Sequence, residues 1–117
     1  MSVEALWTVT FQVESPTPGE KWENGGVVVL ETGRIFGGDS QYYYVGTFKL
    51  AGGDELLGRL KVVHYHGDRR TAFGDAGPIF EVDLHGKLVA PNMITGVMKR
   101  PGFGALAFRL SKREELP

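Results

Sequence analysis

Apolar and polar residues alternate with a period of two along most of this chain, and this alternation constrains its fold more than any other feature. The first run lies near the N-terminus, where apolar residues occupy every second position: Trp7, Val9, Phe11 and Val13. Such alternation is typical of a β-strand with one buried face, because successive side chains of a strand point to opposite sides. No segment keeps apolar residues at helical spacing over three turns. The pattern therefore predicts an almost entirely β protein.

Seven further segments carry strand signals. They are Gly25–Glu31, Arg34–Gly37, Gln41–Leu50, Glu55–His66, Pro78–His85, Met93–Arg100 and Ala105–Ser111. Loops are expected at Glu14–Asn24 and Gly67–Gly77, and the only places that allow a short helical turn are Asp54–Leu57 and the C-terminal tail. Most connections have hairpin length, as at Thr32-Gly33. The sequence predicts an all-β fold, an antiparallel up-and-down β-barrel of about eight strands.

The length of 117 residues allows one domain, which we expect to span residues 1–117 with frayed ends at 1–3 and 112–117. Three glycines, Gly46, Gly58 and Gly96, interrupt strand centres. Glycine at such positions permits strong bending or close approach of neighbouring groups, which helps a sheet to close.

The inward face of the expected barrel is rich in aromatic residues. Those assigned to it are Trp7, Phe11, Tyr42, Tyr44, Phe48, Phe80 and Phe108. An interior of this kind is either packed by its own side chains or holds a small apolar ligand.

Catalytic and cofactor sites are not expected. The chain has no cysteine, its serines lie in no nucleophile-elbow pattern, and its glycines form no phosphate loop, so we expect no enzyme activity and no cofactor. His64 and His66 point the same way and could bind a metal ion with a third ligand from His85, Asp83 or Glu81. Half-buried rim histidines are the preferred interpretation, and no metal is expected.

The charge and the N-terminus narrow the choice of partners. A formal net charge of −1 provides no general field for nucleic acid or for an anionic membrane. The sequence begins without a signal-peptide pattern and has no apolar run long enough for a membrane span. A cytoplasmic protein that binds neither nucleic acid nor membrane is therefore expected.

Several apolar residues fall on the outward faces of the expected strands. They are Tyr43, Val45, Leu57, Val63, Tyr65 and Val97. Apolar side chains on neighbouring strands can form one patch, which would suggest a homodimer or a protein partner. A register error in one strand would instead turn its apolar residues inward.

The segment GGVVVLETGRIFGGDS (residues 25–40), followed by Tyr42–Tyr44 and Gly46, resembles the GrlR-type negative regulators of type III secretion, a bacterial family. The opening Leu6–Phe11 fits the start of that family. The resemblance is most specific over residues 25–48 and looser to about residue 110. It implies a small lipocalin-like β-barrel, usually dimeric.

In the best-known member of that family, an acidic Glu-Asp-Glu-Asp run takes part in binding a transcriptional activator. The matching place is Gly52-Gly53-Asp54-Glu55, where two glycines replace acidic residues. The resemblance thus assigns partner binding to Asp54 and Glu55. The first hypothesis is a non-enzymatic regulatory barrel that binds a protein as a homodimer, and the second is a carrier or sensor of a small apolar molecule or lipid. The third hypothesis is a metal-dependent enzyme that uses His64 and His66.

Overall fold

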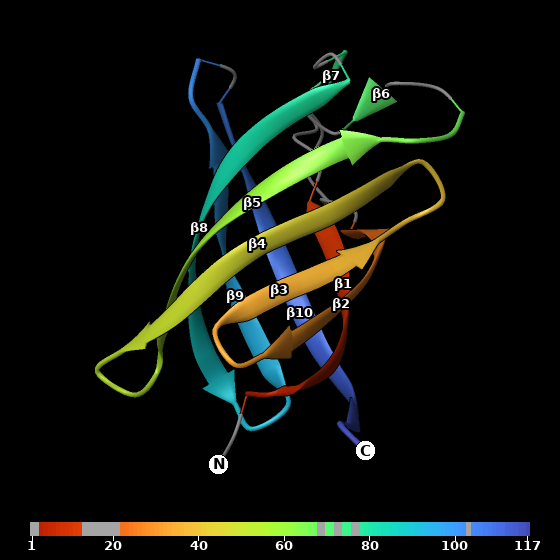
Figure 1. Cartoon of the computed structure of the whole chain (residues 1–117). Helices are drawn as coiled ribbons and strands as arrows, with labels where there is room; N and C mark the ends of the chain where they lie inside the picture. Colours follow the sequence, from red (N-terminus) through yellow and green to blue (C-terminus); the bar gives the residue numbers. More distant parts are fainter. Residues whose placement is uncertain (1–2, 13–21, 68–69, 72–73, 76–77, 103) are drawn as a thin grey trace.

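The structure is a computed structural model, and it describes residues 3–12, 22–67, 70–71, 74–75, 78–102 and 104–117 (Figure 1). These residues form ten strands and no helix. The strands are β1 (Ala5–Gln12), β2 (Trp22–Glu31), β3 (Arg34–Gly38), β4 (Tyr42–Ala51), β5 (Glu55–His64), β6 (Arg70–Thr71), β7 (Gly74–Asp75), β8 (Ile79–Ala90), β9 (Met93–Arg100) and β10 (Gly104–Glu115).

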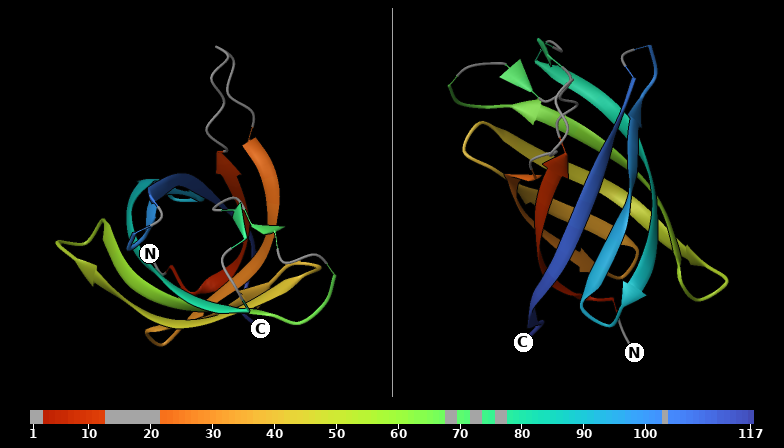
Figure 2. Two further views of the ribbon diagram at one scale, coloured as in Figure 1. Left: turned by 90° about the horizontal axis from the view of Figure 1, so that it is seen from above. Right: turned by 180° about the vertical axis from the view of Figure 1, so that it is seen from behind.

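Eight of these strands close into one antiparallel barrel in the order β1-β10-β9-β8-β5-β4-β3-β2. Each barrel strand pairs with the next one along the chain, and β1 closes the ring by pairing with β10. The view along the barrel shows the closed ring of strands (Figure 2). Strands β6 and β7, between β5 and β8, form a separate two-stranded sheet. The predicted all-β, eight-stranded antiparallel up-and-down barrel is confirmed.

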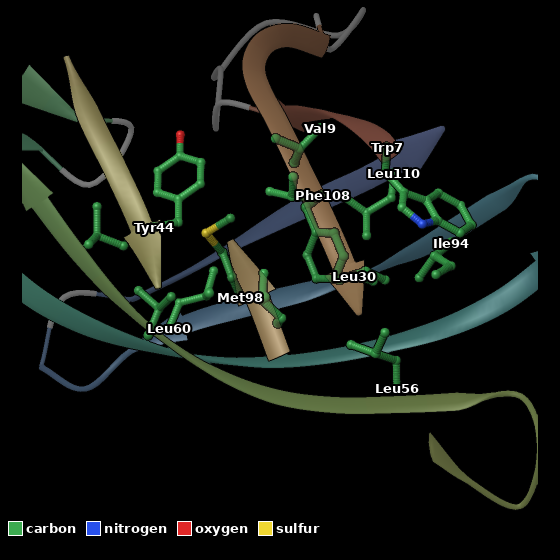
Figure 3. Packing of buried hydrophobic residues seen from close by; sticks show 14 of the residues in the cluster. Trp7, Val9, Leu30, Tyr44, Leu56, Leu60, Ile94, Met98, Phe108 and Leu110 are labelled. Carbon is green, nitrogen blue, oxygen red and sulfur yellow. The ribbon is translucent and has the colours of Figure 1, made fainter. Parts of the chain in front are cut away.

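The period-two alternation separates the inside of the barrel from its outside. In β4, Tyr42 and Tyr44 are buried, whereas Tyr43 and Val45 are exposed. Side chains from β1, β2, β4, β5, β9 and β10 meet in the interior (Figure 3). Complete burial of one large apolar side chain stabilises the fold by about 1.5–3 kcal/mol, so this core is the main source of stability.

Two of the predicted glycines lie where neighbouring backbones come close together. A Cβ atom added at Gly46 would lie 2.0 Å from the carbonyl oxygen of Arg59. One added at Gly96 would lie 2.2 Å from the carbonyl oxygen of His85 and 2.5 Å from the Cα of Gly86, its direct partner in the sheet. No side chain fits at either position, so the tight approach of adjacent strands requires glycine there.

Several predicted boundaries were wrong. Strand β10 continues to Glu115, where the tail was expected to fray, because Glu114 and Glu115 pair with Leu6 and Ala5 of β1. At the other end Val3 is buried, and its carbonyl accepts a hydrogen bond from Trp7 Nε1 at 2.9 Å. Val3 is thus held by its hydrogen bond from Trp7, and residues 114–115 are held by their pairing with β1.

The remaining differences concern strand lengths. Strand β8 reaches Ala90 because its second half pairs with β9, and β2 begins at Trp22, inside the expected loop, because it pairs with the end of β1. Neither of the two places that allowed a short helical turn has one. The chain is extended from Glu55 onward in β5, and the C-terminal tail is extended in β10. Strand β5 ends at His64, two residues earlier than predicted. Val13 of the first predicted strand and residues 14–21 of the expected loop lie outside the described residues.

Candidate functional site

The interior contains all seven aromatic side chains that were assigned to it. Five are buried: Trp7, Tyr42, Tyr44, Phe80 and Phe108. Phe11 and Phe48 are partly buried and pack against the same core. Among the described residues, no polar or charged residue is classed as buried. The fully buried residues of the interior are therefore apolar or aromatic.

Aromatic rings gather near one end of the interior. The Tyr42 ring stands edge-on to His64 and to Phe80, with centroids 5.2 and 6.2 Å away. The Arg100 guanidinium lies over the Phe80 ring, 4.6 Å from its centroid. A cation held over an aromatic face is attracted by the electron density of the ring.

Asp39 connects the turn between β3 and β4 to two tyrosines. Its Oδ1 accepts hydrogen bonds from the backbone N–H groups of Gln41 and Tyr42, each at 2.8 Å. The Tyr44 hydroxyl donates to Oδ2, and the Tyr65 hydroxyl donates to the Asp39 carbonyl. Burial, and next the hydrogen bond to Asp39, raises the pKa of Tyr44 above its ordinary value, so this hydroxyl stays protonated and can donate.

The predicted outer wall separates into two regions. Strand register brings Tyr43 beside Val63, and the Tyr43 and Tyr65 rings lie 6.3 Å apart. These residues belong to a larger set of apolar outer residues, which we call the Tyr43 patch: Val27, Phe36, Tyr43, Val45, Val63, Tyr65 and Ile79. All except the half-buried Val63 are exposed, with Ile79 and Tyr65 most exposed at 60% and 55%.

The other two residues of the predicted wall lie farther along the barrel. Leu57 and Val97 flank His85 in one row across β5, β8 and β9. They border a shallow hollow of about 480 Å³. Its lining residues are Leu57, Gly58, Asp83, Leu84, His85, Val97 and Lys99. The six residues therefore do not form one continuous wall.

Charged side chains separate the two regions. We call Arg59 and Lys61 of β5 with Glu81 and Asp83 of β8 the charged band. Arg59 Nη2 lies 2.9 Å from Glu81 Oε2, and Arg59 Nε lies 3.8 Å from Asp83 Oδ1. These side chains are well exposed, so each pair contributes no more than about 1 kcal/mol to stability.

The acidic turn forms ion pairs within the chain. Asp54 Oδ2 lies 3.8 Å from Lys87 Nζ, and Glu55 Oε1 lies 3.1 Å from His85 Nε2. Gly52 and Gly53, which precede Asp54 in this turn, have φ angles of +63° and +89°. Glycine adopts this left-handed backbone at little cost, whereas an acidic residue would be strained. The glycines are thus a requirement of this turn.

The two histidines considered as metal ligands differ in exposure and in position relative to β5. His64 is half-buried and its Nε2 lies 2.8 Å from the Gly67 carbonyl oxygen, while His66 is exposed beyond the end of β5. Across the residues that the structure describes, no group of three or more histidine, cysteine, aspartate or glutamate side chains is placed to hold a metal ion.

Comparison with known proteins found no family model that matches the chain and no match among the curated proteins. Because the described part of the chain is free of helices, it also contains no helical membrane span.

The sequence analysis missed Asp39 and three residues of the Tyr43 patch, namely Val27, Phe36 and Ile79. Ile79 could have been found, since it precedes the inward Phe80 and must point outward. Phe36 lies beside Val45 in the Tyr43 patch. It could also have been found, because it lies in a predicted hairpin strand, where alternate side chains point outward. Asp39 was recognised only as part of a turn, because its contacts with Tyr44 and Tyr65 join residues up to 26 positions apart.

Proposed function

We propose that this protein is a non-enzymatic regulatory barrel that acts in the cytoplasm by binding other proteins, as its resemblance to GrlR-type negative regulators suggests, and that it works as a homodimer. The Tyr43 patch carries this proposal. Its exposed apolar side chains come from β2, β3, β4 and β8 and from the end of β5. Contiguous apolar surface on a small domain is typical of a protein interface.

Asp54 and Glu55 are the proposed contacts for a regulatory partner. Their side chains are 51% and 47% exposed, and their ion pairs with Lys87 and His85 are surface pairs. Such pairs are weak, so a basic partner can replace Lys87 and His85 at little cost. A partner with a basic surface is thus the expected match for this turn.

Capture of partners from a native bacterial lysate tests this function. The bait proteins are the wild type, the double variant Asp54→Asn/Glu55→Gln and the control Glu114→Gln, which changes an exposed acid on β10. We expect a defined partner that the wild type and the control retain and that the double variant loses about tenfold, because rim charges steer association. Equal capture by all three baits, or no specific partner, would contradict the proposal.

The second candidate function is transport or sensing of a small apolar molecule or lipid inside the barrel. The observation that favours it is the inward placement of all seven predicted aromatic side chains. Native mass spectrometry of the purified protein tests it. A stoichiometric mass increase that organic extraction removes would support the carrier function, and a bare protein mass after exposure to a lipid extract would argue against it.

A further inference from the structure

The outer wall formed by β5 and β8 has opposite charges on its two strands. Strand β5 presents Arg59 and Lys61, whereas β8 presents Glu81 and Asp83. In the antiparallel register Lys61 stands opposite Glu81, and Arg59 stands opposite Asp83. The charged band is therefore basic along one strand and acidic along the next.

Ion pairs within one chain leave some charged side chains of this band available for contact with a second molecule. Arg59 forms a close ion pair with Glu81 and a longer one, at 3.8 Å, with Asp83. Lys61 is exposed and makes no ion pair within the described part of the chain. Because exposed pairs are worth little, these side chains can exchange their contacts for contacts with a second molecule.

We propose that a second copy of this chain packs face to face on the β5–β8 wall, with the two-fold axis parallel to the strands and between β5 and β8. This inference rests on the proposed homodimer and specifies its geometry. Rotation about that axis places β5 of one protomer over β8 of the other at the same level. Lys61 then faces the partner subunit's Glu81, and Arg59 faces the partner subunit's Asp83, each pair occurring twice.

Apolar residues at one end of the charged band complete the contact. Val63 stands opposite Ile79 within one protomer, so the same rotation places Val63 over the partner subunit's Ile79. Ile79 is 60% exposed, the largest fraction among the large hydrophobic side chains of the described residues. Two sheets packed in this way keep nearly aligned strands, as in other face-to-face sheet pairs.

Charge excludes the other face-to-face arrangement centred on this wall. In that arrangement the two-fold axis would run perpendicular to the strands, between the Lys61–Glu81 pair and the Arg59–Asp83 pair. Each strand would then lie over the same strand of the partner subunit. Lys61 would then face the partner subunit's Arg59, and Glu81 would face the partner subunit's Asp83. Like charges in direct opposition disfavour an interface, so only the axis parallel to the strands is complementary.

Charge reversal tests this geometry. The variants are Lys61→Glu and Glu81→Lys, measured singly and as an equimolar mixture by sedimentation equilibrium at low salt, where surface charges are least screened. We expect each variant alone to dimerise at least about tenfold more weakly than the wild type, because both interfacial pairs become repulsive. The mixture should recover heterodimers close to wild-type affinity, because both pairs then join glutamate to lysine.

Controls separate this inference from the proposed homodimer. Glu114→Lys on β10, which β9 separates from β8, should leave dimerisation unchanged, and circular dichroism checks that each variant is folded. If the wild type is a dimer and the charge-reversal variants dimerise as strongly, the proposed geometry is wrong but the homodimer stands. The same holds if the mixture does not recover heterodimers. A monomeric wild type would overturn both, while partner capture by Asp54 and Glu55 would remain a separate question.

Discussion

Single side chains fix the rim of the barrel near the end of β5. Asp39 uses its carboxylate to hold the turn before β4 and to accept the Tyr44 hydroxyl, while its carbonyl accepts the Tyr65 hydroxyl. The Gln41 carbonyl in turn accepts the backbone N–H of Tyr65 at 2.9 Å. Tyr65 belongs to the Tyr43 patch, so these hydrogen bonds hold one of its most exposed aromatic rings in position. A fixed ring loses less conformational entropy when a partner covers it.

Tyr44 predicts a loss of stability in alkali. Its pKa is raised in the folded protein, first by burial and then by Asp39, whereas the unfolded chain ionises near the ordinary value of about 10. A group with a raised folded pKa contributes its full stability below the unfolded value and loses it as the pH rises further. The free energy of unfolding should therefore fall above pH ~10, by up to about 1.4 kcal/mol per pH unit from this group.

Urea denaturation of the wild type, Tyr44→Phe and Tyr43→Phe between neutral and alkaline pH measures this effect. Tyr44→Phe should be less stable at neutral pH by about 1 kcal/mol, since a buried hydrogen bond is lost, and should show a shallower alkaline slope. Tyr43→Phe, an exposed tyrosine, should keep the wild-type slope. Equal slopes in all three proteins would show that Tyr44 does not carry this dependence.

At the scale of strands, register decides which residues meet. Alternation identifies the outward face of each strand, and it correctly directed Tyr43 and Val45 outward. It does not specify which residues of adjacent strands share a row. The register places Leu57 and Val97 beside His85 and places the charged band between them and Tyr43. The six-residue wall expected from sequence is thus divided by residues that alternation alone could not position.

Close strand contacts predict a specific sensitivity to substitution at glycine. Gly96→Ala should destabilise the protein by about 2–3 kcal/mol, since the new methyl group would overlap the backbone of His85 and Gly86. Gly58→Ala is the matched comparison, because its Cβ would lie 3.0 Å from the Thr47 carbonyl oxygen and otherwise meet only side chains. It should cost about 1 kcal/mol or less, partly offset by the reduced entropy of the unfolded chain.

Thermal and urea unfolding of both variants measure the difference. If Gly96→Ala were as stable as Gly58→Ala, the close approach of β8 and β9 would not be a requirement for closing the barrel.

How much could be predicted from the sequence differs between the fold and the site. The eight strands and the seven inward aromatic residues follow from alternation and turn signals, which are local. The extension of β10 to Glu115 could not be predicted in this way. The charged residues at its end carry no strand signal, and they are ordered by pairing with β1, more than 100 residues away. The contacts of Asp39 and the division of the outer wall likewise depend on which strands become neighbours, so they appear only in the folded molecule.

At the scale of the whole molecule, the barrel has an apolar interior and an outer surface on which apolar and charged regions alternate. The Tyr43 patch, the charged band and the hollow beside Leu57 follow one another along the wall of β4, β5, β8 and β9. The closed barrel has no free strand edge for pairing, so the proposed association of two copies uses side chains of the wall. In the proposed dimer, the β5–β8 wall meets the second copy through opposite charges and, at one end, through Val63 and Ile79.

The mass of the wild-type protein in solution tests this account most directly. Sedimentation equilibrium at low salt, over a wide range of protein concentration, should give a mass of twice the 12.8 kDa chain, with dissociation promoted by added salt. A mass of one chain at every concentration would contradict the claim that this barrel acts as a homodimer joined through its outer wall.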